Sequence, residues 1–380
     1  MERQIALFTL AGVPHAKITS FPFSTADKLG LTLTRFTREG GGPPRDAVLV
    51  IHGLTTSMDM FIMPEHYNLV RYLLDHGHHD VWCLDYRMSN RLPYNLHAHR
   101  YTMDDIAMFD YPAALAEMRR HIGDRPIHVI SHCLGAVSFA MSLFGKAVHG
   151  LRSVTANSAA LTLRVPLWSL AKLAVAPFLV ERVLGQPYMS PSWSDNPRFT
   201  VGKLFARMVS LFHRECDVPA CHMLSAMWGT GWPALYSHAN LLPETHQRGR
   251  DLYGATGLHY YRHVRKIVLA GRAVKYDRTN DGVASLPDDY LAQAADITTP
   301  MLLMTGASNH VFTNSNIVCF ERLESVAPGR HRLQVIPGYG HQDVFMGKAV
   351  DQDVFPLLVK FMAEHADEVP SVRSAAVFAH

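Results

Sequence analysis

The chain has 380 residues, of which 48% are hydrophobic and 18% charged, and its formal net charge is +3. This supply of apolar side chains excludes a disordered or low-complexity chain and predicts a large buried core. The small net charge, without a long run of Lys or Arg, argues against nucleic acid as a partner. The five cysteines are too few and too scattered for a disulfide framework, which favours a reducing, cytoplasmic location.

Two apolar stretches are too short or too interrupted to span a membrane. Residues 5–13 have no clear small-residue cleavage site after them, so we expect a strand there and not an export signal. Residues 165–180 contain Lys172 and Pro177 and fall short of the ~20 residues that a bilayer span needs. We therefore expect no integral membrane span. The tail after residue 366 is expected to be frayed surface.

Five apolar runs predict buried strands of a mostly parallel sheet, because such strands are covered on both faces. They are residues 47–51, 80–85, 127–130, 300–306 and 332–336. Apolar residues at helical spacing predict helices at 67–76, 104–121, 136–144 and 354–364, and Thr102 is a candidate N-cap for the second. This alternation of strands and helices indicates an α/β protein.

The strand pattern is absent between residues 161 and 295, where Trp, Met, His and Pro occur in apolar, helix-like segments. We therefore expect a sheet core made of residues 1–160 and 296–380, with residues 161–295 inserted as a helical cap. Most tryptophans of this insertion are expected to form its own core. Trp228 is our candidate for a substrate-binding side chain in an apolar pocket.

A candidate nucleophile lies where the third predicted strand meets a helix. The sequence there is Ser131-His132-Cys133-Leu134-Gly135, which resembles the G-x-S-x-G turn of α/β-hydrolases with Cys133 in the place of the serine. A thiol at a helix N-terminus is expected to have a lowered pKa. The alternative is an inert buried cysteine, which is a common packing residue.

Other parts of the same machinery follow in the expected order. His52 and Gly53 end the first strand, and we expect the backbone amides of Leu54 and Leu134 to form an oxyanion hole. His52, Gly53 and His132 are also candidates for substrate contacts. His341 stands on a glycine-rich loop after the last strand, where this fold places its general base.

The third member of the predicted triad is an amide. Asn309 occupies the position three residues after Gly306, which is usually an aspartate. A Cys-His-Asn set is chemically coherent, because a thiolate–imidazolium pair stabilises itself and the third group needs only to hold the ring. The alternative for Asn309 is a turn former or helix cap.

These motifs resemble a known group. The segments 80–87, 102–113 and 340–343 look like the acid-lipase branch of the α/β-hydrolase superfamily. The motifs at 131–136, 219–222, 306–309 and 335–341 are closer to the α/β-hydrolase module fused to cholesterol-oxidase-like GMC oxidoreductases. The resemblance covers roughly residues 25–365 and implies acyl or ester chemistry on a lipophilic substrate. By analogy, it also implies an oxidoreductase as a possible partner.

No G-x-G-x-x-G unit is present, so no redox cofactor is expected. The leading hypothesis is a cysteine-dependent hydrolase or acyltransferase that acts on an ester or thioester through an acyl-thioester intermediate. The alternatives are a non-catalytic lipid- or sterol-binding module, and a lyase or isomerase on the same scaffold.

A second group of chemically active residues lies in the predicted cap. His213, Cys216, Cys221 and His222 could be drawn as a zinc site. Adjacent Cys221 and His222 point awkwardly for tetrahedral ligation, however. We therefore expect no metal there, and favour a disulfide between Cys216 and Cys221 or simple packing.

Overall fold

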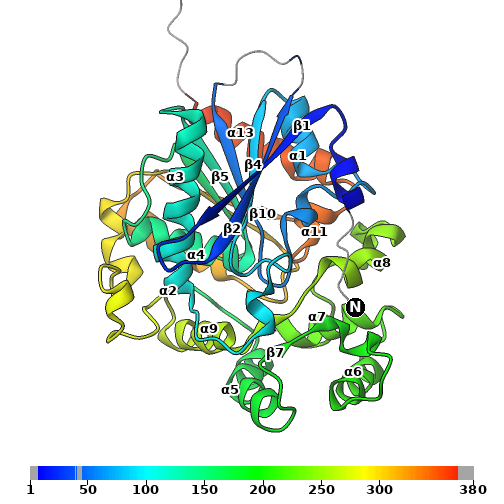
Figure 1. The fold of residues 1–380 in the computed structure, drawn as a ribbon. Coiled ribbons are helices and arrows are strands. Elements are labelled where there is room, and N and C mark those ends of the chain that lie inside the picture. The colour runs from blue at the N-terminus through cyan, green and yellow to red at the C-terminus, as the bar shows by residue number, and fades with distance from the viewer. Residues whose placement is uncertain (1–6, 39, 41–44, 367–380) are drawn as a thin grey trace, which may run out of the picture.

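The computed structural model describes residues 7–38, 40 and 45–366 (Figure 1). Its centre is an eight-stranded sheet in the order β1-β2-β4-β3-β5-β6-β9-β10. The strands are β1 (Ala16–Ser24), β2 (Gly30–Arg38), β3 (Ala47–Ile51), β4 (Asp80–Asp85), β5 (Ile127–His132), β6 (Ser153–Asn157), β9 (Met301–Gly306) and β10 (Arg332–Ile336). The two pairings that involve β2 are antiparallel, and the other pairings in this sheet are parallel. The predicted α/β fold with a mostly parallel sheet is confirmed.

Burial explains which strands the sequence revealed. Every residue of β3, β4, β5, β6 and β9 is buried, so four of these strands read as continuous apolar runs. The short β6 contains Ser153, Thr155 and Asn157 and was not among the predicted strands. The edge strand β1 is partly exposed along its length, so its sequence lacks such a run and was also missed, as was its partner β2.

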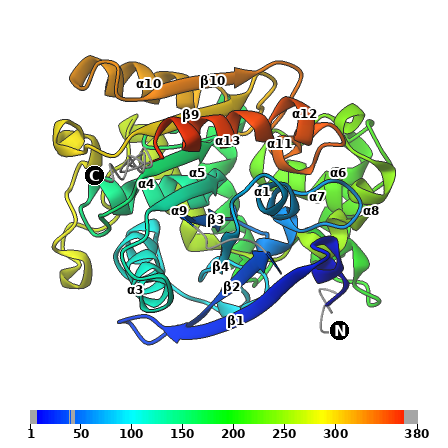
Figure 2. The ribbon, with the colours of Figure 1, turned by 90° about the horizontal axis from the view of Figure 1, so that it is seen from above.

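Helices cover both faces of the sheet (Figure 2). Outside the segment between β6 and β9, the helices are α1 (Leu69–Asp75), α2 (Met103–Asp105), α3 (Tyr111–Ile122), α4 (Cys133–Phe144), α10 (Ser315–Val326), α11 (Asp343–Met346), α12 (Val350–Asp353) and α13 (Phe355–Glu364). The predicted helix at 104–121 begins at the expected cap, where Thr102 and Asp105 form a capping box. It then passes through a π-helical turn, Ile106–Asp110, before α3.

The segment between β6 and β9 is largely helical, and it lies beyond the carboxyl ends of the parallel strands (Figure 1). Its helices are α5 (Leu167–Arg182), α6 (Val201–Phe212), α7 (Pro219–Trp228), α8 (Pro243–Leu252) and α9 (Leu258–Ala270). A short pairing of β7 (Tyr188–Met189) with β8 (Thr256–Gly257) joins its two halves. Parallel strands present functional loops at this end of the sheet, so the helices stand where they can cover a site.

Short 3-10 turns complete the chain, and one of them corrects an expectation. They are η1 (Leu7–Gly12), η2 (Met58–Phe61), η3 (Pro93–Leu96), η5 (Pro191–Asp195), η6 (His238–Asn240), η7 (Asp281–Val283) and η8 (Tyr290–Asp296). The strand predicted at 5–13 is wrong where the structure describes it, because Leu7–Gly12 is a 3-10 helix. The start of that stretch and the tail predicted after residue 366 lie outside the described residues.

Two further expectations can be compared with the described residues. None of the helices described here has the length and hydropathy required to cross a bilayer. All five cysteines are free thiols, so of the two alternatives expected for Cys216 and Cys221 the disulfide is wrong.

Candidate active site

Cys133 stands at a strained turn between strand β5 and helix α4. Its φ is +55°, a left-handed conformation that non-glycine residues rarely adopt. Neighbouring glycines make the turn possible. A Cβ on Gly135 would lie 2.1 Å from the carbonyl oxygen of His52, and one on Gly53 would lie 2.9 Å from Cys133 Cβ. This is the strand-turn-helix geometry that presents a nucleophile in α/β-hydrolases.

The two predicted oxyanion-hole residues both lie at the thiol. The backbone N–H groups of Leu54 and Leu134 interact with Cys133 Sγ and favour its anionic form. They come from different segments, the loop after β3 and the first turn of α4. Two amides that converge beside a nucleophile are suited to binding the oxyanion of a tetrahedral intermediate.

His341 is held from both its ring and its backbone. Its Nδ1 lies 3.2 Å from Asn309 Oδ1. The backbone N–H of His341 donates to the Leu235 carbonyl at 2.9 Å, and its carbonyl accepts from Ser158 Oγ at 3.2 Å. These contacts fix the loop that carries the ring against both the insertion and the end of β6.

The thiol and two imidazoles form one compact group. Nitrogen atoms of His132 and His341 and the sulfur of Cys133 all lie within 4.8 Å of one another. The two rings have centroids 4.9 Å apart, and His132 Nδ1 lies 2.8 Å from Asn157 Oδ1. These three side chains are of types that can ligate a metal ion. They are equally suited to proton transfer between sulfur and nitrogen.

The predicted lowering of the Cys133 pKa is wrong. Burial raises the pKa of this thiol to about 12, and it outweighs the two amides that lower it. Burial and the neighbouring His132 also hold the pKa of His341 well below its ordinary value. The resting pair is therefore a neutral thiol beside a neutral imidazole. It is not the thiolate–imidazolium pair expected from the helix position.

The predicted substrate-contact residues fall into different surroundings. Gly53 lies directly against Cys133 and His132, and His132 lies beside both Cys133 and His341. The fully buried ring of His52 contacts the Gly53 carbonyl at 2.6 Å and packs on Tyr86, so its described contacts support the loop beneath the site. The ring of Trp228 stacks on Tyr261 in the helical segment between β6 and β9, with ring centroids 4.3 Å apart.

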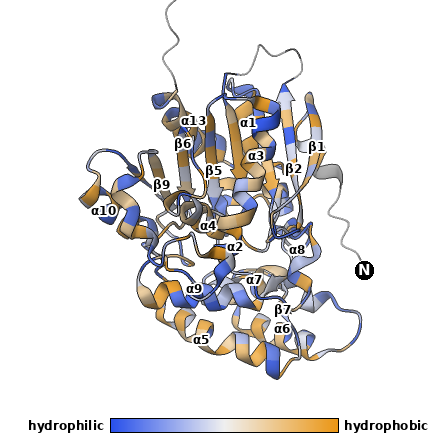
Figure 3. Cartoon of the chain, turned by 60° about the vertical axis from the view of Figure 1, so that its left-hand side comes forward, coloured by the Kyte–Doolittle hydropathy of each residue, from blue (hydrophilic) through white to orange (hydrophobic). Residues whose placement is uncertain are grey.

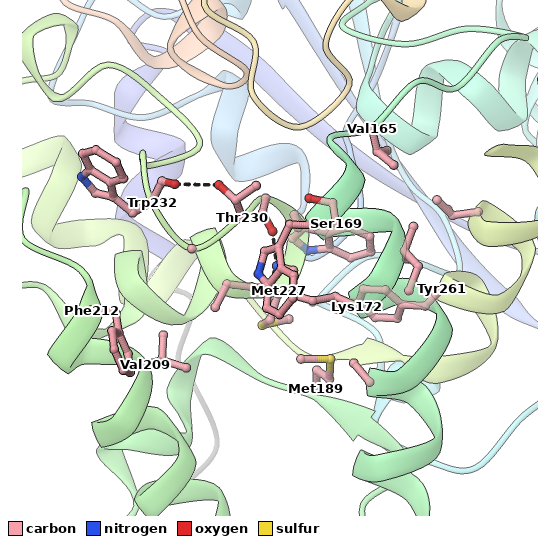
Figure 4. A pocket seen from close by; sticks show the side chains of 18 of the residues that line it. Val165, Ser169, Lys172, Met189, Val209, Phe212, Met227, Thr230, Trp232 and Tyr261 are labelled. Atoms are coloured by element: carbon pink, nitrogen blue, oxygen red, sulfur yellow. Dashed lines mark hydrogen bonds between the residues drawn. The ribbon is translucent and has the colours of Figure 1, made fainter. Parts of the chain in front are cut away.

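Trp228 and Tyr261 line an apolar cavity of about 470 Å³ within the insertion (Figure 4). The cavity is bounded by α5, α6, α7 and α9. Its lining residues include Trp168, Leu173, Met189, Phe205, Phe212, Met227 and Phe312. Phe312 connects the cavity to the site, because its ring packs against the ring of His341 with centroids 5.8 Å apart. The cavity therefore approaches the group formed by Cys133, His132 and His341 from the side of the insertion.

Sequence reasoning missed several residues of this site. Phe312 and the backbone amide of Val311 follow Asn309 closely, and their chain position next to the predicted triad could have drawn attention to them. Asn157 and Ser158 are not among the site residues predicted from the sequence. They lie at the end of β6, whose carboxyl end meets the site, and this position could have revealed them.

Comparisons with known proteins identify the fold of the chain. A family profile described as the alpha/beta hydrolase fold matches residues 46–347. No curated protein sequence matches the chain. Among solved structures, a lipase in an open form is 15% identical with a TM-score of 0.59, over 93% of this chain and 100% of its own. A thermostable carboxyl esterase from Bacillus coagulans, in complex with glycerol, is 12% identical with a TM-score of 0.59, over 92% of this chain and 99% of its own. A thermophilic esterase from Thermogutta terrifontis is 14% identical with a TM-score of 0.50, over 92% of this chain and 100% of its own. With its fold, its strained turn and this match over most of its length, the chain belongs to the α/β-hydrolase fold family.

Proposed function

We propose that the protein is a cysteine-dependent hydrolase or acyltransferase that cleaves an ester or thioester of a lipophilic acyl or sterol-like group. One arrangement carries this proposal: Cys133 at a left-handed turn, with its sulfur beside two backbone amides and close to His341. A purely structural cysteine needs none of these three features. Strain at a single residue is typical of functional sites, where the surrounding structure maintains it.

The first half of the reaction forms an acyl-enzyme. Cys133 Sγ attacks the substrate carbonyl carbon as His341 Nε2 takes the thiol proton, so charge develops only when substrate is present. The N–H groups of Leu54 and Leu134 hold the oxyanion. When the intermediate collapses, the bond to the alcohol or thiol leaving group breaks and His341 returns the proton to that group.

The second half releases the acyl group. His341 takes a proton from water, or from an acceptor alcohol or amine, as that molecule attacks the thioester carbonyl. The carbon–sulfur bond then breaks and Cys133 recovers its proton. Thioesters react readily with amines and thiols, so transfer to an acceptor other than water belongs to the proposal.

The lipophilic substrate class rests on the apolar insertion. The cavity beside Phe312 is lined mainly by aromatic and aliphatic side chains, of which Trp228 is our proposed acyl or ring contact. Helices α5 and α6 also carry many hydrophobic residues (Figure 3), several of which are exposed to solvent. Among them, Leu167 is 86% exposed and Phe212 is 77% exposed. A lipase and esterases share the fold, which makes ester chemistry a natural first test.

The decisive experiment combines turnover with detection of the intermediate. Wild type and Cys133→Ala would be assayed on p-nitrophenyl esters and acyl thioesters of graded chain length, and intact-mass spectrometry would detect an acyl adduct. We expect activity and an adduct only in the wild type, with a loss of at least ~10³-fold in the variant. An alanine variant that retains turnover refutes the nucleophile. Cys319→Ala is the matched control, because Cys319 is a buried thiol of α10, away from the site.

A second candidate function is a lipid- or sterol-binding module without catalysis. The raised pKa of the Cys133 thiol favours it, as does a cavity whose lining does not include Cys133. Such a module would bind a fluorescent fatty acid or sterol in wild type and Cys133→Ala alike, with no acyl adduct. The oxidoreductase partner implied by the sequence resemblance stays a prediction.

A further inference from the structure

A second cluster of sulfur and nitrogen ligands lies in the insertion, away from Cys133. Ligand atoms of His213, Cys216, Cys221 and His238 all lie within 4.8 Å of one another. The four residues come from the end of α6, the loop after it, the first turn of α7 and the start of η6. The ligand atoms therefore converge from separate segments. Helical spacing within one element does not explain the cluster.

Both imidazoles present the same nitrogen to the cluster. His213 Nδ1 lies 2.8 Å from the Gly231 carbonyl oxygen, and His238 Nδ1 lies 3.0 Å from Glu215 Oε2. Each Nδ1 is thus the proton donor, which leaves each Nε2 with a free lone pair. A metal-bound histidine commonly has this arrangement, in which a carbonyl or carboxylate fixes the ring from behind.

The inward-facing nitrogens face the thiols of Cys216 and Cys221. His213 is 95% buried, and its Nε2 has no hydrogen-bond partner among the described residues. His238 Nε2 lies 3.5 Å from Cys221 Sγ. Bonds of about 2.3 Å to sulfur and about 2.0 Å to nitrogen at a tetrahedral angle place those two atoms about 3.5 Å apart. This pair therefore already has the separation of one edge of a tetrahedral zinc site.

We propose that His213, Cys216, Cys221 and His238 form a structural zinc site. Two thiolates with two imidazoles in a closed tetrahedron are a ligand set typical of structural zinc, with no position left for a substrate. The proposal replaces the expectation of no metal, and it changes the ligand set drawn from the sequence. His222 is not a ligand, because its two nitrogens face Ser210 Oγ at 2.9 Å and the Cys216 carbonyl at 2.7 Å.

The site would stabilise the segment that holds the catalytic loop. Glu215, which orients His238, also accepts a hydrogen bond from the backbone N–H of Ala234 at 3.1 Å. The next residue, Leu235, accepts the backbone N–H of His341 at 2.9 Å. Zinc bound by His213 and His238 would therefore fix the chain between these two residues. That chain includes Leu235, whose carbonyl holds the backbone of His341, the proposed general base.

The test is the metal content of the purified full-length chain, measured by mass spectrometry of the metal after expression in zinc-supplemented medium. We expect about one zinc per chain in the wild type. Cys216→Ser/Cys221→Ser should lose it, whereas Cys319→Ala should keep it. Cys133→Ala should also keep it, which separates this cluster from the group around His341. A wild type without stoichiometric zinc after reconstitution in reductant overturns the proposal, as does a double variant that retains it.

Glu215→Ala provides a test that leaves all four ligands in place. Loss of a residue that orients a ligand typically weakens metal affinity by about 10- to 100-fold, so this variant should lose zinc to a chelator at a lower chelator concentration. Cobalt bound to the wild type should give the absorption bands of tetrahedral thiolate coordination. Octahedral bands, or an unchanged affinity in Glu215→Ala, contradict the site. None of these measurements depends on catalysis, so the outcome is independent of the proposed function.

Discussion

Asn309 Oδ1 accepts a hydrogen bond from His341 Nδ1 and, at the same time, from the backbone N–H groups of Val311 and Phe312 at 3.0 and 3.1 Å. Backbone amides can only donate, so these contacts identify the atom that faces His341 as the oxygen. The His341 proton therefore resides on Nδ1, and Nε2 is left as a base. A neutral amide thus sets the tautomer without placing a charge beside the ring.

This relationship predicts different effects for two substitutions of Asn309. Asn309→Ala removes the positioning contact and should lower kcat about tenfold, the rate equivalent of one hydrogen bond of ~1.4 kcal/mol. Asn309→Asp keeps an acceptor for both backbone amides and adds a negative charge, which raises the His341 pKa. Activity requires neutral His341. As the pH is lowered, Asn309→Asp should therefore lose activity at a higher pH than the wild type does.

The measurement is the pH dependence of kcat/KM for the three proteins on one ester. The wild type should retain activity below pH 6.5, because burial holds the His341 pKa well below that value. An acid limb at the same pH in wild type and Asn309→Asp would contradict a positioning role for Asn309.

Gly135 allows the turn at Cys133 to pack against the end of β3. A Cβ at this position would lie 2.1 Å from the backbone oxygen of His52, which cannot rotate away. Gly135→Ala should therefore destabilise the fold by about 3 kcal/mol or more. Thermal unfolding would measure this loss. Gly30→Ala is the control, since the nearest atom to its Cβ would be Tyr94 Oη at 3.7 Å. Equal melting temperatures for both variants would contradict this account.

The sequence alone predicted most of the strands that are buried on both faces, and the turn whose residue types match a known catalytic motif. The apolar runs 47–51 and 127–130 identified β3 and most of β5, and the pentapeptide at 131–135 identified the turn between β5 and α4. Chain order then placed Asn309 and His341. These features are local, so they are visible in a single sequence.

The parts that could not be predicted depend on contacts between distant segments. The helix position of Cys133 is visible in the sequence, but its burial is not, and burial decides the pKa of its thiol. Similarly, His222 is adjacent to Cys221 in the chain, yet His238 is the histidine that approaches its sulfur. Sequence adjacency suggests His222 as the histidine nearest to the Cys221 thiol, but the ring orientations depend on contacts with Ser210, Glu215 and Gly231.

A buried ion pair supports the core beside the site. Arg87 is fully buried and forms two bonds to Asp110 Oδ1, at 2.8 and 2.5 Å, while it also pairs with Asp27 at 2.9 Å. Arg87→Ala leaves the buried Asp110 carboxylate uncompensated and should cost about 3–5 kcal/mol of unfolding free energy. Denaturant unfolding would measure it.

The control for the Arg87 variant is an ion pair that is exposed to solvent. Asp296→Ala breaks the contact between Asp296 and Lys146, whose side chains are 61% and 53% exposed. It should change stability by less than ~1 kcal/mol. A loss in Asp296→Ala that matches the loss in Arg87→Ala would show that burial is not the deciding factor.

Buried histidines predict that stability falls as the solution is acidified from pH 7 to pH 5. Burial lowers the pKa of His66, His128 and His132 to about 4, below the 6.5 of an unfolded chain. Between these values the unfolded state binds more protons, so the unfolding free energy decreases as pH falls, by up to about 2 kcal/mol for each such residue. Buried carboxyl groups act in the opposite direction, because burial raises the pKa of Asp85 to about 6 from 3.8 and also raises the pKa of Asp105, Asp110 and Asp343. Histidines whose pKa is lowered by burial outnumber these four groups.

Guanidinium unfolding at pH 7, 6 and 5 tests this balance, with His66→Gln as the informative variant. Glutamine can still donate to the Phe345 carbonyl that His66 contacts at 3.2 Å, but it cannot titrate. The variant should therefore lose less stability between pH 7 and pH 5 than the wild type, whatever its absolute stability at pH 7. Parallel pH curves for the two proteins would show that His66 is accessible to protons in the folded state, and stability that rises on acidification would show that the carboxyl groups dominate.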